Sequence, residues 1–201
     1  MVIDLGLYLD STLSMEPHVN RIRSMAFARL HLIARVRRCL RRPDCTLLVK
    51  SLVLSHLTYC MPILAGLSKK SILRLQQIVN ASIRLFHGLR ESVSIDAIMR
   101  DERWLPVVNM IMLRILMLTF KVLRSGEPAY LRSLLTEYVP GRNLRSSDQQ
   151  LLNIPRLRLQ SSHWSFRHIA PRLWNDLPPA IRLSLNASAF KTHWFDFLLA
   201  R

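Results

Sequence analysis

The side chains with the clearest chemistry in this chain are arginines near its amino terminus. Eight arginines and no acidic residue lie between His18 and Pro43. A guanidinium group donates paired hydrogen bonds to phosphate oxygens and stacks on flat rings, so a row of arginines along a helix would contact a nucleic-acid backbone. A solvated helix face without a partner is the alternative interpretation. The phosphate-binding candidates of this segment are Arg21, Arg29, Arg35, Arg37, Arg38, Arg41 and Arg42.

Two later groups of residues extend this interpretation. Trp164 and Arg167 lie in a mixed aromatic and basic segment, a combination that stacks unpaired bases. Trp174 has a different setting, Ala-Pro-Arg-Leu-Trp-Asn, in which a core anchor is expected. The polar side of a further predicted helix carries the candidates Arg74, Gln76 and Arg84.

No arrangement of residues predicts catalysis or a metal site. The only adjacent acidic pair is Asp101-Glu102, between Arg100 and Arg103, where a capping or salt-bridged loop is expected. The sequence has no Asp-Asp pair, no glycine-rich phosphate loop and no nucleophile elbow. Two histidines, at 163 and 168, have no cysteine pair at zinc-finger spacing. We therefore expect no metal and no cofactor.

The cysteines and the most apolar segment bear on the environment of the chain. Cys39, Cys45 and Cys60 are odd in number and form no CxxC pair, so a reducing interior and buried thiols are expected. The apolar stretch 107–123 carries Arg114 at its middle, which disfavours a membrane span and favours a buried helix. Localisation stays open, although basic residues 35–42 are compatible with nuclear import.

The overall composition predicts a folded, strongly basic protein. The chain has 201 residues, half of them apolar, with a net charge of +16 and 24 arginines against 5 lysines. A chain of this length buries a sizeable core without disulfides or metals. The arginine excess favours nucleic acid as a partner over mere solubility.

Helical periodicity dominates the central part of the sequence. Ser14 with Pro17 is expected to open a long helix, because apolar residues recur every three or four positions from Val19 to Leu40. Residues 2–10 read as a strand that lacks a partner strand nearby. The other expected elements are helices over 45–60, 68–88, 107–124, 128–137 and 187–199, a helical turn over 95–99, and a small hairpin of 151–154 with 157–159. The fold class is therefore mainly α, a helical bundle over 15–137 with a short N-terminal strand (1–14) and an irregular, weakly α+β C-terminal segment (138–201).

Short runs of residues recur along nearly the whole chain in an order and spacing typical of one protein family. They are Leu5-Gly6-Leu7, Leu9-Asp10, Leu13-Ser14, His18-Val19, Leu57, Tyr59-Cys60, Gly66-Leu67, Leu75-Gln76, Asn80-Ala81, Arg84, Trp104-Leu105-Pro106, Phe120-Lys121, Pro128, Tyr130-Leu131, Leu134-Leu135, Tyr138, Pro140, Arg142, Leu144-Arg145-Ser146-Ser147, Pro155-Arg156, Phe166, Ala170-Pro171, Leu173-Trp174-Asn175, Leu177-Pro178, Arg182 and Phe190-Lys191. In these runs the chain resembles the segment that follows the palm in jockey-like non-LTR (LINE) retrotransposon reverse transcriptases.

The resemblance implies a role in holding nucleic acid. Residues 1–14 would be a residual palm-edge strand and 15–137 a thumb that grips an RNA–DNA hybrid or duplex through its backbone. The palm aspartates and the endonuclease domain would be missing, so the chain would be a non-catalytic fragment that lacks an N-terminal palm. The sequence departs from the family at Arg103, where histidine is usual, at Met110, where a basic residue is usual, and at Ser162-His163-Trp164, which replaces Gly-x-Arg.

Two other interpretations compete with this one. The chain would be a decayed or truncated retroelement copy without function if its helices fail to form a cooperative fold. It would be a helical protein-interaction scaffold if its leucine-rich faces meet a partner protein.

Overall fold

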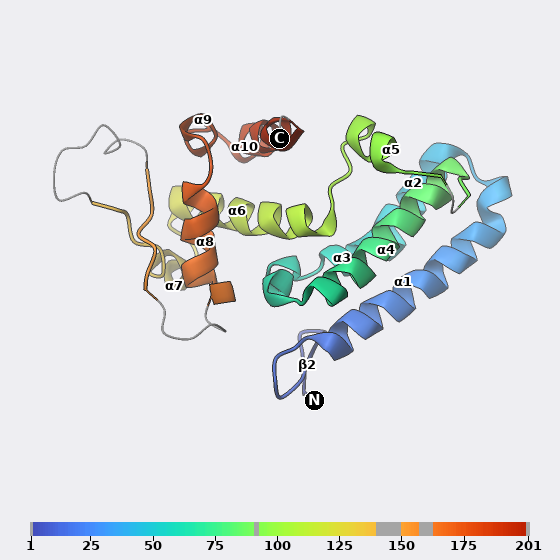
Figure 1. The fold of residues 1–201 in the computed structure, drawn as a ribbon, viewed down its shortest axis with the longest axis horizontal. Coiled ribbons are helices and arrows are strands. Elements are labelled where there is room, and N and C mark those ends of the chain that lie inside the picture. The colour runs from blue at the N-terminus through green and yellow to red at the C-terminus, as the bar shows by residue number, and fades with distance from the viewer. Residues whose placement is uncertain (1, 91–92, 140–149, 157–162, 200–201) are drawn as a thin grey trace. The chain divides into compact units, whose positions relative to one another are not determined.

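The computed structural model describes residues 2–90, 93–139, 150–156 and 163–199. The fold is mainly helical, as the sequence predicts, and a short two-stranded antiparallel sheet lies at the amino terminus (Figure 1). The chain forms two compact units, Met1–Met110 and Ile111–Arg201. The expected bundle 15–137 thus extends over parts of both units. No helix in the described ranges is long and apolar enough to cross a membrane.

The first unit begins with a hairpin of β1 (Val2–Asp4) and β2 (Leu7–Leu9). The strands pair antiparallel, with Ile3 opposite Tyr8. Leu5 and Gly6 both have positive φ, 43° and 83°, which is the backbone of a tight two-residue turn. The prediction of a strand without a nearby partner was therefore wrong. The turn at Leu5-Gly6 reverses the chain, so β2 becomes the partner strand of β1.

Helix α1 (Glu16–Val36) buries the predicted apolar stripe, including Val19, Ile22 and Leu30. Its N-cap residue is Met15 rather than Ser14. Asp10 accepts hydrogen bonds from the backbone amides of Ser14 (3.1 Å) and Met15 (3.0 Å) just before the helix. Together with the Thr12 hydroxyl, these donors hold the pKa of Asp10 well below its ordinary value.

The long helix ends earlier than predicted. Residues Arg37–Cys39 form a 3₁₀ turn (η1) and Leu40 is extended, so the stripe does not continue to Leu40. Pro43 explains the break, because it has no N–H to bond the carbonyl four residues back in a continuing helix. Val36 is consequently 48% exposed.

The cysteines also differ from the prediction. Cys45 is buried, but Cys39 is exposed and Cys60 is half-buried. The expectation of three buried thiols was correct for Cys45 alone. Cys39 lies in the 3₁₀ turn η1, after the end of α1, and is exposed there.

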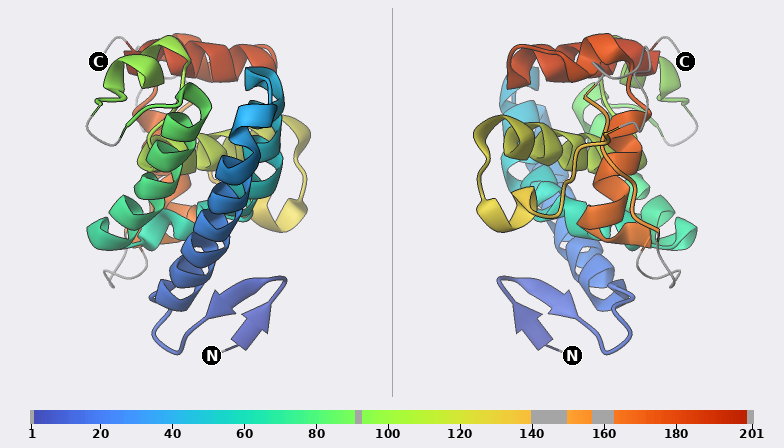
Figure 2. Two further views of the ribbon diagram at one scale, coloured as in Figure 1. Left: turned by 90° about the vertical axis from the view of Figure 1, so that its right-hand side faces the viewer. Right: turned by 90° about the vertical axis from the view of Figure 1, so that its left-hand side faces the viewer.

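A continuous helical stretch follows, formed by α2 (Arg42–Val49), a π-helical segment η2 (Lys50–Leu54) and α3 (Ser55–Thr58). A 3₁₀ turn, η3 (Met61–Gly66), connects it to α4 (Lys69–His87). The predicted ends of α4 are confirmed: Ser68 accepts a hydrogen bond from the Ser71 amide, and Gly88 closes the helix with φ of 64°. Helices α1 and α4 lie side by side (Figures 1 and 2). The short α5 (Asp96–Asp101) comes next.

Helix α6 (Val107–Ser125) carries the chain from the first unit into the second. The predicted helix over 128–137 is only the single turn α7 (Ala129–Arg132), because the chain becomes extended and pairs Glu137 with Leu152. Leu152 thus has a strand-like partner, although not the predicted one. Residues 157–159, the other half of the predicted hairpin, lie outside the described residues.

The rest of the second unit is more helical than predicted. Helices α8 (Phe166–Asn175) and α9 (Pro179–Arg182) were not expected, because prolines at 171, 178 and 179 suggested an irregular segment. Helix α10 (Ala187–Leu199) matches the predicted range. Its Phe190 packs against Phe120 and Trp174, with ring centroids 4.9 Å and 6.0 Å away. These aromatic rings form part of the core of the unit.

Candidate nucleic-acid interface

Helix α1 presents two of the candidate arginines on its outer side. Arg21 and Arg35 are 14 positions apart, nearly four full turns, so they project from one face about 21 Å apart along the axis. That face lies opposite the stripe that includes Ala26 and Leu30. Arg38 follows in η1 and is also exposed. We call Arg21, Arg35 and Arg38 the arginine face.

The arginine face keeps its charge available. Among the described residues, none accepts a hydrogen bond from the side chain of Arg21, Arg35 or Arg38, and none forms an ion pair with these guanidinium groups. The small exposed residues Ser24 and Ala28 lie between the first two arginines, and α1 has no acidic residue after Glu16. A phosphate backbone could therefore approach this face without meeting a carboxylate.

Other candidates from the same segment serve the fold instead. Arg37 donates from Nε to the Leu85 carbonyl (3.0 Å) and from Nη2 to the Phe86 carbonyl (2.9 Å), at the carboxyl end of α4. These carbonyls have no partner within their own helix, so the guanidinium satisfies them and its charge complements the helix dipole. Arg29 donates to the Leu52 carbonyl at 2.6 Å.

Two further arginines pair with carboxylates. Arg74 on α4 lies 2.9 Å from Glu16 of α1, so it joins the two helices. Arg41 pairs with Asp44 at 2.9 Å, but its side chain is 85% exposed and the pair contributes little to stability. Of these two, only Arg41 remains accessible to a large partner.

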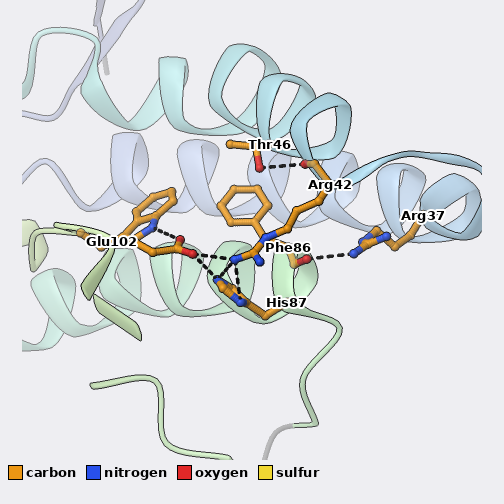
Figure 3. A network of polar contacts seen from close by, with 7 residues as sticks. Arg37, Arg42, Thr46, Phe86, His87 and Glu102 are labelled. Carbon is orange, nitrogen blue, oxygen red and sulfur yellow. Dashed lines mark hydrogen bonds and ion pairs between the residues drawn. The ribbon is translucent and has the colours of Figure 1, made fainter. Parts of the chain in front are cut away.

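Arg42 belongs to a polar network that ties α2 to α4 and to the loop after α5 (Figure 3). Its Nη2 lies 2.6 Å from Glu102 Oε1, and His87 Nε2 lies 3.2 Å from the same oxygen. Burial alone would raise the pKa of Glu102, but hydrogen bonds from Trp104 and His87 and the charge of Arg42 outweigh it and lower the pKa. The predicted salt-bridged loop at Asp101-Glu102 is thus present at Glu102, and Arg42 is its cation.

The polar side of α4 also has structural partners. Gln76 accepts a hydrogen bond from the Val107 amide at 2.8 Å, which caps the amino end of α6, and it donates to Asn80 at 2.9 Å. Arg84 is half-buried and donates to the Val93 carbonyl at 3.3 Å. The sequence indicated polarity here but did not reveal the contacts with Val93 and Val107, since both residues lie in later parts of the chain.

The aromatic candidates belong to the second unit. Trp164 is 54% exposed, and Arg167 on α8 is exposed. Trp174 is 1% exposed and donates from Nε1 to the Gln150 carbonyl at 2.8 Å, so the predicted core anchor is confirmed. The Nδ1 atom of His163 lies 3.2 Å from the Nε2 atom of His168. No group of three potential metal ligands occurs in the described part of the chain.

Positive charge is shared equally between the two units. The first has 16 basic and 8 acidic residues and the second 13 and 5, so each carries a formal net charge of +8. Three carboxylates of the first unit each form an ion pair with an arginine, namely those of Glu16, Asp44 and Glu102. The arginine face is the part of α1 and η1 where this excess meets solvent.

Arg37 and Arg38 allow a matched test of structural against accessible arginines. Replacing Arg37 with methionine should lower the free energy of unfolding by about 1–2 kcal/mol, because the two carbonyls at the carboxyl end of α4, those of Leu85 and Phe86, lose their charged donor. Replacing Arg38 with methionine should change it by less than about 0.5 kcal/mol. Urea denaturation followed by circular dichroism measures both values. Equal effects of the two substitutions would contradict the assigned roles.

No known protein-family model matches the chain, and no curated protein or solved structure matches it either.

Proposed function

We propose that this chain is a non-catalytic nucleic-acid-binding fragment that contacts the phosphate backbone through its arginine face. The observation that carries the proposal is the exposure of Arg21, Arg35 and Arg38 without carboxylate partners among the described residues. Charged contacts of this kind position a nucleic acid without reading its sequence.

The dimensions of the arginine face suit a backbone. The separation of about 21 Å between Arg21 and Arg35 corresponds to roughly six base-pair steps at 3.4 Å per phosphate along one strand. The residual charge of +8 in the first unit would add long-range attraction. Both features support sequence-independent binding.

The resemblance to jockey-like reverse transcriptases supports the same role and implies that the partner is an RNA–DNA hybrid or a duplex. A thumb grips an RNA–DNA hybrid or duplex beside the catalytic palm. Polymerisation of that type needs metal ions held by aspartates, including an adjacent pair, and the sequence has no such pair. The proposed role is therefore binding, with catalysis left to a domain that this sequence does not contain.

A salt titration tests the proposal. Binding of a labelled RNA–DNA hybrid is measured by fluorescence anisotropy at several salt concentrations. The logarithm of the affinity should fall linearly with the logarithm of the salt concentration. The slope should be about −2.7 or steeper, because each of the three phosphate contacts contributes about −0.9. Salt-independent binding, or no binding at low salt, would contradict the backbone role. Template-directed nucleotide incorporation by the purified chain would contradict the absence of catalysis.

Exposed apolar side chains favour one second candidate, a helical scaffold for a partner protein. Leu32, Leu47 and Leu73 are 60%, 67% and 65% exposed on three different helices. Single exposed leucines are common on protein surfaces, so this observation is weaker than the arginine face. Concentration-dependent association in light scattering, unchanged by salt, would favour the scaffold.

A further inference from the structure

A groove of about 380 Å³ runs between α1 and the carboxyl half of α4 in the first unit. Phe27, Leu30 and Leu85 supply apolar lining, and Leu30 is the most buried of the three. Ala34 and Ala81 are also lining residues, and their small side chains leave the groove open. The volume lies within the range of about 300–1,000 Å³ typical of small-molecule sites.

The polar lining of the groove is basic. Its charged or titratable lining residues are His31, Arg37 and Arg84, and none of the acidic residues that the structure describes lines it. The Arg37 guanidinium is held in place by its bonds to the Leu85 and Phe86 carbonyls, so it forms a fixed part of the wall. An occupant should therefore combine a flat or apolar body with negative charge.

The aromatic lining residue is already suited to stacking. Phe27 is half-buried, and the Arg23 guanidinium lies over its ring at 5.5 Å from the centroid. Bases stack on aromatic and guanidinium planes with little dependence on sequence. Arg35 of the arginine face follows the lining residue His31 by four positions in α1, so a phosphate bound by Arg35 would lie on the same side of the helix as this part of the groove wall.

We infer that the α1–α4 groove holds an unpaired base of a single-stranded nucleic acid whose neighbouring phosphates contact Arg35 and Arg38. This inference rests on the proposed function and narrows its partner to a strand with at least one unpaired base. A continuous duplex keeps its bases stacked inside, so it would contact the arginine face and leave the groove empty.

Two substitutions in the groove test this inference. Ala34→Leu fills the groove at an exposed position, and Phe27→Leu removes the aromatic ring while it keeps an apolar side chain. Each should weaken binding of a labelled oligothymidine about 5- to 100-fold, as expected for the loss of one stacked base. Binding of a blunt DNA duplex should change less than about twofold. Ala97→Leu, at an exposed position of α5 in the same unit, is the matched control and should change neither.

The outcomes separate this inference from the proposed function. If both groove variants bind oligothymidine as the unmodified chain does, while charge reversal of the arginine face abolishes binding, the base-binding role of the groove is contradicted. The proposed contact of the arginine face with the phosphate backbone would then stand. Equal loss of single-strand and duplex binding would also overturn the base-binding role of the groove. Failure of the unmodified chain to bind any nucleic acid would contradict both the groove inference and the proposed function. Self-association that Ala34→Leu abolishes, measured by light scattering, would assign the groove to a second copy of the chain instead.

Discussion

Replacing Trp174 with alanine should lower the free energy of unfolding of the second unit by about 3–5 kcal/mol. Trp174 is 1% exposed, stacks on Phe190 and donates to the Gln150 carbonyl at 2.8 Å. The substitution would leave a large cavity beside Phe120 and Phe190 and would remove the donor of the Gln150 carbonyl. A loss of this size is comparable to the whole stability of many domains, so the unit should unfold at a much lower denaturant concentration.

Trp164 provides the control for this experiment. It is 54% exposed, and its replacement by alanine should change the unfolding free energy by less than about 0.5 kcal/mol. Chemical denaturation combined with hydrogen exchange and mass spectrometry would localise each effect to a segment. A Trp174→Ala protein as stable as the Trp164→Ala protein would show that the aromatic core does not hold the second unit. Non-cooperative unfolding of the unmodified chain would instead favour a decayed copy without function.

Reversing the charge of the arginine face should produce the largest effect on binding. The triple variant Arg21→Glu, Arg35→Glu, Arg38→Glu should bind an RNA–DNA hybrid about 100-fold more weakly or worse near 0.1 M salt, because three phosphate contacts are lost and three carboxylates repel the backbone. The slope of log affinity against log salt should become shallower by about 2.7. Anisotropy titrations at several salt concentrations measure both quantities.

A second triple variant separates local contacts from overall charge. Lys69, Lys70 and Arg100 are exposed in the same unit, and their replacement by glutamate changes the net charge by the same amount. We expect this variant to lose much less affinity than the arginine-face variant, since only long-range attraction is reduced. Equal losses would assign binding to the general positive field and remove the arginine face as an interface.

Local patterns in the sequence were sufficient for several elements. Ser68 and Gly88 marked the ends of α4, and the apolar runs located α6 and α10. These features act over three or four residues, through caps, helix-specific spacing and the conformational freedom of glycine. The burial of Trp174 was also predictable from its apolar neighbours.

The roles of the arginines required the tertiary structure. Arg37 and Arg38 are adjacent and chemically identical, yet the first caps α4 and the second faces solvent. Arg42 pairs with Glu102, 60 positions away along the chain, and Arg74 pairs with Glu16, 58 positions away. No periodicity within one helix contains that information, because a guanidinium is positioned by whichever carbonyl or carboxylate the packing of other helices brings near it. The sequence by itself determined a basic helical protein, and the packing of α1 against α4 decided which of its positive charges remain available to a partner.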